Sequence, residues 1–80
     1  MFTGILNHLE DYRMNIDKKI FFHETMIEGS KLEMTIAHAN EEWGKIKTLL
    51  AENKVHRERI KELNVTKNRL EKINQIISKI

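Results

Sequence analysis

The chain has 80 residues, no cysteine and no proline, with 40% apolar and 32% charged residues. This size allows one domain with a small core, the missing cysteine excludes disulfides and thiolate metal sites, and the composition suits amphipathic helices better than a disordered tail. No apolar run is long enough to cross a membrane and no basic segment opens the chain, so we expect a cytoplasmic protein.

The charge is unevenly distributed. Residues 1–44 hold four Lys/Arg and eight Asp/Glu, and residues 45–80 hold ten and four. Oppositely charged halves attract each other if the chain folds back on itself or if two chains pair antiparallel. Heavy use of Ile, Lys and Asn suggests an AT-rich genome, such as that of a phage or a low-GC bacterium.

The first expected element is a helix over residues 3–28. Its apolar residues recur every three or four positions, at Phe2, Ile5, Leu9, Tyr12, Ile16 and Ile20. Gly29 can end a helix, and Ser30 with Glu33 has the form of a capping box that starts the next. These signals predict a tight turn at residues 29–30. An alternative is a β-hairpin over residues 19–37, where apolar and polar residues partly alternate.

The second expected element is a long helix over residues 31–80. Asn40 followed by two acidic residues is a further start signal, so the helix could restart or kink there. Coiled-coil spacing then runs along Ile46, Leu49, Asn53, His56, Ile60 and Leu63. A second stripe (Leu70, Ile73, Ile77, Ile80) appears out of phase with the first. This predicts a stutter or break near residues 64–66, or helix ends that pack on different neighbours.

Together these elements predict an all-α single domain over residues 1–80. We expect an antiparallel helical hairpin with a long coiled-coil-like second helix, assembled into an oligomer. Polar residues near the seam are of the kind that fixes register in coiled coils, namely Asn53, Asn64 and Lys67. The alternatives are a three-helix bundle broken near Asn53 or Asn64, and an α+β fold with the hairpin at 19–37.

The sequence offers no constellation for catalysis, and we expect no enzyme, cofactor or metal. The four histidines are 15 to 18 residues apart, whereas a helical metal pair needs ligands three or four residues apart. No serine lies in a nucleophile elbow, and no glycine-rich phosphate loop is present.

The displaced apolar stripe from Leu70 to Ile80 predicts a protein-interaction module, such as a regulator, adaptor or inhibitor, that docks on a larger protein. Trp43 is core if it is buried at a helix crossing and an interface anchor if it is exposed. Phe21 and Phe22 are adjacent and cannot both face one core. The predicted interface comprises Phe21, Phe22, Trp43, Leu70, Ile73, Ile77 and Ile80.

Basic residues of the C-terminal half predict a different function, nucleic-acid binding. A straight helix would align several of them in a lengthwise stripe suited to phosphate contact. The candidates are Lys47, Lys54, Arg57, Lys61, Arg69 and Lys72. The same residues would also suit a merely solvated face. A third possible role is that of a structural assembly subunit, which needs only the helices.

Overall fold

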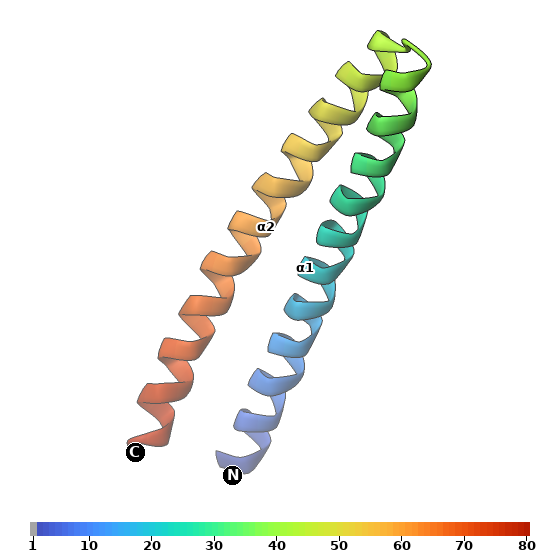
Figure 1. Cartoon of the computed structure of the whole chain (residues 1–80). Helices are drawn as coiled ribbons and strands as arrows, with labels where there is room; N and C mark the ends of the chain where they lie inside the picture. Colours follow the sequence, from blue (N-terminus) through green and yellow to red (C-terminus); the bar gives the residue numbers. More distant parts are fainter. Residues whose placement is uncertain (1) are drawn as a thin grey trace.

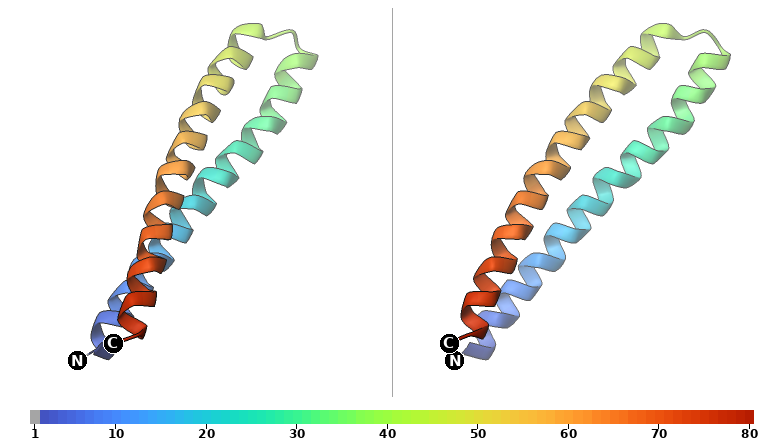
Figure 2. Two further views of the ribbon diagram at one scale, coloured as in Figure 1. Left: turned by 90° about the vertical axis from the view of Figure 1, so that its left-hand side faces the viewer. Right: turned by 60° about the vertical axis from the view of Figure 1, so that its left-hand side comes forward.

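The computed structural model is a hairpin of two long antiparallel helices. Helix α1 spans Phe2–Ala39 and helix α2 spans Trp43–Ser78. The structure describes the backbone of residues 2–80, and the side chains of residue 4 and of residues 7–80. The molecule is a rod with extents of 60 × 15 × 12 Å, with both chain ends at the end opposite the turn (Figures 1 and 2). The predicted all-α hairpin is confirmed.

The core is a single seam between the helices, built on a seven-residue repeat. Four apolar side chains in it are buried, namely Ile16, Ile27, Ala37 and Leu49. Half-buried residues continue the same spacing of three and four along both helices. The other seam residues are Leu9, Ile20, His23, Ser30 and Met34 in α1, and Ile46, Asn53, His56, Ile60, Leu63, Lys67, Leu70 and Ile77 in α2.

The turn at residues 40–42 reverses the chain through backbone hydrogen bonds. The Glu42 N–H donates to the Ala37 carbonyl at 2.8 Å, and the Glu41 N–H donates to the His38 carbonyl at 3.1 Å. This pair of bonds is a Schellman motif, which requires the left-handed conformation at the residue after the cap. Glu41 occupies that position with a φ of 57°, although glycine is the residue that adopts it without steric cost.

The predicted turn at residues 29–30 is wrong, as are the helix bounds 3–28 and 31–80. Helix α1 continues through Gly29, whose φ is not positive, and Ser30 is a buried residue of the seam. Ser30 therefore has the residue type of a helix cap but occupies a buried position in the seam. The predicted restart near residue 40 is confirmed, because α1 ends at Ala39 and α2 begins at Trp43, although the N-cap residue is Glu42 and not Asn40.

Residues 2–80 contain neither the β-hairpin nor the third helix. Residues 19–37 are helical throughout, and α2 runs unbroken past Asn53 and Asn64. The apparent phase change near residue 65 arose from grouping Ile73 with Leu70 and Ile77. Leu70 and Ile77 continue the seam at intervals of seven from Leu63, whereas Ile73 is exposed.

We predict that Glu41→Gly stabilises the hairpin. Glycine at a left-handed position avoids a cost of roughly 1 kcal/mol, so the free energy of unfolding should rise by about that amount. Urea unfolding followed by circular dichroism measures it. The control is Glu42→Gly, because Glu42 has a φ of −87° and gains nothing from glycine. Equal effects at both positions would contradict the assigned turn.

Candidate functional site

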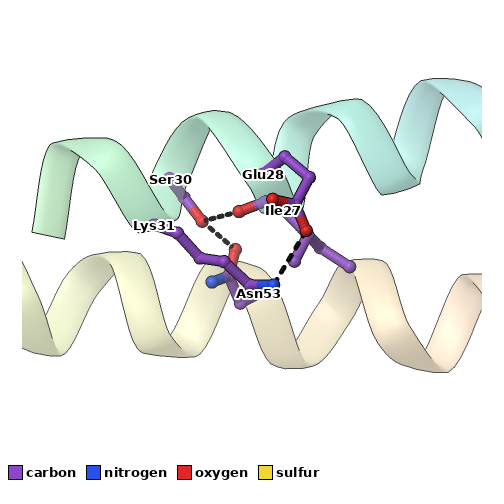
Figure 3. Close-up of polar contacts among 5 residues, drawn as sticks. All are labelled: Ile27, Glu28, Ser30, Lys31 and Asn53. Atoms are coloured by element: carbon purple, nitrogen blue, oxygen red, sulfur yellow. Dashed lines mark hydrogen bonds and ion pairs between the residues drawn. The ribbon is translucent and has the colours of Figure 1, made fainter.

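A buried polar pair interrupts the apolar seam nearest the turn. Ser30 and Asn53 are 8% and 2% exposed. The Ser30 hydroxyl lies 2.6 Å from the Asn53 side-chain oxygen and 2.8 Å from the Ile27 carbonyl, so its single proton has two acceptors to choose from (Figure 3). A buried polar pair that meets in only one alignment penalises every other register of the two helices.

A histidine pair forms the next layer away from the turn. The Nδ1 atoms of His23 and His56 lie 2.7 Å apart, so one neutral ring donates and the other accepts. Phe22 packs edge-on against both rings. Desolvation, followed by repulsion from His56 and Arg59, lowers the pKa of His23 below its ordinary value of 6.5. The contact therefore favours neutral imidazole at His23.

One ion pair crosses the seam among the described residues. The Lys67 ammonium lies 2.7 Å from the Asp17 carboxylate, and both side chains are partly exposed. Such a pair contributes little to stability, about 0–1 kcal/mol, but it adds a third constraint on alignment. The polar residues of the seam thus specify which residues meet.

Two outer faces flank the seam. A shallow groove on one side, which we call face A, is lined by Lys19, His23, Arg59, Glu62, Leu63 and Thr66. Lys19 and Arg59 each precede a seam isoleucine in their own helix. Glu10 and Glu71 each follow a seam leucine, so they lie on the other side, which we call face B. The groove on face B is lined by Leu9, Glu10, Arg13, Leu70, Glu71, Asn74 and Ser78.

The predicted interface residues are divided among these surfaces. Leu70 and Ile77 are half-buried in the seam against α1. Phe22 and Ile73 are exposed on face A, and Phe21 is 69% exposed on face B. Trp43 is 57% exposed at the turn end of face B, where its ring meets His38 edge-on.

Ile80 lies just beyond the end of α2 and is 84% exposed. It belongs to neither the seam nor a helix face.

The predicted basic residues are all exposed but do not form one continuous stripe. Lys47, Lys54 and Lys61 recur every seven residues on face B, with Arg57 beside them. Arg69 lies on face A, and Lys72 lies on the outer surface of α2, on the side away from the seam. Face B therefore carries a short basic row on α2 toward the turn, and an acidic row on α1 toward the chain ends formed by Glu10, Asp17 and Glu24.

The interhelical partners were missed at the level of sequence. Asn53 and Lys67 were expected near the seam, but their partners Ser30 and Asp17 were not, and Asn64 is exposed. The seven-residue interval from Ile16 through His23 and Ser30 to Ala37 is the signal that would have placed Ser30 and the histidine pair in the seam.

Comparisons with protein-family models, with curated proteins and with solved structures give no match to this chain. Within residues 2–80, neither helix contains a stretch apolar enough to span a bilayer. In the same part of the chain, no three His, Cys, Asp or Glu side chains gather as a metal site would require.

We predict that Asn53→Ala destabilises the hairpin by about 1–3 kcal/mol, because it removes a buried hydrogen bond and leaves a cavity. Urea unfolding measures the loss, with the exposed Asn64→Ala as a matched control that should change stability by less than about 0.5 kcal/mol. The double variant Ser30→Ala/Asn53→Leu should recover the stability, since no polar group is left unpaired. If Asn53→Ala matched the control, the pair would be energetically irrelevant.

We predict that the free energy of unfolding is level above about pH 6.5 and falls as the pH decreases below it. The folded state binds a proton at His23 less readily than the unfolded chain does, so acid favours unfolding. Urea unfolding at pH 7.5, 6.5 and 5.5 tests this. His23→Gln should flatten the dependence, whereas His8→Gln on the exposed surface should preserve it. Parallel pH profiles for both variants would contradict the assignment.

Proposed function

We propose that the protein is a non-enzymatic interaction module that docks on a larger protein through face B. The observation that carries this proposal is the exposure of two large aromatic side chains, Phe21 and Trp43, on the same side of a rigid hairpin. Exposed aromatic residues are the commonest anchors of protein interfaces, because they bury large areas with few rotatable bonds.

The surroundings of these anchors support a protein partner. Leu50, 55% exposed, adds an aliphatic contact on the same face. On this face the basic row of α2 lies toward the turn and the acidic row of α1 lies toward the chain ends, and together they would orient a partner that carries charges of both signs. Such rows contribute mainly to association rate and specificity, while the apolar anchors contribute most of the affinity.

Adjacent phenylalanines provide a matched test of this proposal. We predict that Phe21→Ser abolishes capture of the partner from host lysate, because it removes an anchor from face B. Phe22→Ser should preserve capture, because Phe22 lies on face A. Quantitative mass spectrometry of proteins retained by each variant and by the wild type measures both. A partner retained equally by Phe21→Ser and the wild type, or lost equally with both variants, would argue against docking through face B.

The second candidate function is nucleic-acid binding, favoured by the regular spacing of Lys47, Lys54 and Lys61 along one straight helix. These side chains recur at intervals of about 10 Å, so each could contact a different phosphate of one nucleic-acid backbone. The capture experiment separates the two functions when it is repeated with nuclease and with Lys54→Glu/Lys61→Glu. Binding to nucleic acid predicts that retained material disappears with nuclease and with the charge reversal, and is unchanged in Phe21→Ser.

A further inference from the structure

Face A carries more exposed apolar surface than a soluble hairpin needs. From α1 it includes Tyr12, Phe22, Met26 and Ile36, and from α2 it includes Val55, Ile73 and Ile76, each at least 45% exposed. These are seven of the fourteen large apolar side chains exposed among the described residues. Among the side chains that the structure describes, the seam buries four apolar residues. A large apolar face beside a small core is typical of a surface that is covered in the functional state.

The charges on the α2 part of face A have an internal symmetry. The central residues of this stripe are Glu52, Val55, Arg59, Glu62, Thr66 and Arg69, with Lys45 and Thr48 toward the turn and Ile73 and Ile76 toward the chain ends. Consider a second copy of α2 that runs in the opposite direction and is centred on the same bond, between Ile60 and Lys61. Arg59 of one copy then faces Glu62 of the other, and Glu52 faces Arg69. Every acid then meets a base, and Val55 meets Thr66. The stripe is therefore complementary to a second, antiparallel copy of itself.

The centre of this symmetry coincides with the centre of the hairpin. Trp43 and Ser78, the first and last residues of α2, are equally distant from the Ile60–Lys61 bond. Phe2 and Ala39, the ends of α1, are likewise equally distant from the bond between Ile20 and Phe21. The seam contacts at His23–His56 and Asp17–Lys67 place both centres at nearly the same height on the rod.

A single two-fold axis that passes the centres of α1 and α2 can therefore stack two hairpins face to face along their full length. Each copy of α2 would lie on the other copy of α2, and each α1 on the other α1, with the turn of one copy over the chain ends of the other. A face 60 Å long and 15 Å wide is large enough for a stable interface, which buries about 800 Å² per partner.

We infer that face A binds a second copy of this chain, forming an antiparallel four-helix bundle in which α2 pairs with α2. At the two-fold axis, the Arg59–Glu62 pair that lies 3.4 Å apart within one copy meets the same pair of the other copy, forming a cluster of four alternating charges. On either side, Glu52 of one copy faces Arg69 of the other. Toward the ends of the stripe, Ile73 and Ile76 of one copy lie over Thr48 and Lys45 of the other, and the aliphatic stem of a lysine can cover apolar surface.

Two single-cysteine variants test the geometry, because the natural chain contains no cysteine. In the antiparallel dimer Val55 of one copy faces Thr66 of the other. Two copies of Val55 are 11 positions apart along the helix pair, about 16 Å. A mixture of Val55→Cys and Thr66→Cys should therefore link rapidly with a short bis-maleimide, whereas each variant alone should not.

A charge-swap cycle tests the recognition. Glu52 and Arg69 are 17 residues apart in the chain, about 25 Å along α2, so they cannot pair within one copy. Glu52→Arg and Arg69→Glu should each raise the dimer dissociation constant by about tenfold, as two attractive pairs become repulsive. The double variant should restore the wild-type value. Sedimentation equilibrium measures the constants, and circular dichroism verifies that each variant keeps its helices.

A strictly monomeric wild-type protein would overturn the inference. A dimer in which each cysteine variant links to itself, or in which the double charge swap fails to restore affinity, would overturn the antiparallel α2–α2 arrangement. The result is independent of docking through face B, because the variants used here lie on face A and Phe21→Ser does not.

Discussion

Two helices packed against each other share only one seam, and every other property of this molecule depends on that limit. In a larger bundle each helix contacts two or more neighbours, so its apolar residues can point in several directions and still be buried. Here an apolar residue outside the seam has no neighbour and is exposed. Because four apolar side chains are buried in the part of the chain whose side chains are described, the isolated hairpin depends heavily on how well its seam is aligned.

Alignment comes from the polar layers. An apolar seam of isoleucine and leucine tolerates sliding by one heptad, since the residues that meet after the shift are nearly equivalent. The Ser30–Asn53 hydrogen bond, the His23–His56 contact and the Asp17–Lys67 ion pair each have different chemistry. Sliding by seven residues would break all three at once. Polar residues thus occupy seam positions that apolar residues could fill, and they specify one register of the two helices.

The fold class was predictable from the sequence, whereas the position of the turn was not. Periodicity alone predicts two long helices, because proline is absent and apolar residues recur every three or four positions. Local signals then misplaced the turn, since Ser30 has the chemistry of a helix cap and a place in the seam. The true turn contains Glu41 in a conformation that favours glycine, so the only local signal at this place was the helix start signal at Asn40, which was weaker than the glycine at residue 29. Its position follows from the pairing of residues far apart in the chain.

The misplaced turn also prevented a correct assignment of the candidate surfaces. Exposure of Trp43 and the separation of Phe21 from Phe22 onto opposite faces depend on where the seam lies, and the seam could not be assigned while the turn was misplaced. Once the turn is at residues 40–42, the spacing assigns each described residue to the seam, to face A, to face B or to the outer surface. The missing information was which residues of α1 meet which residues of α2, and the preferences of individual residues for helix or turn could not supply it.

Both chain ends lie at the same end of the rod, with the turn at the far end (Figure 2). A unit with this layout can be spliced into a surface loop of a host protein, because it enters and leaves the host at neighbouring points. The rod would then extend outward from the host protein and hold the turn roughly 50 Å from the host surface. The hairpin is therefore a natural spacer for displaying a peptide epitope grafted at residues 40–42.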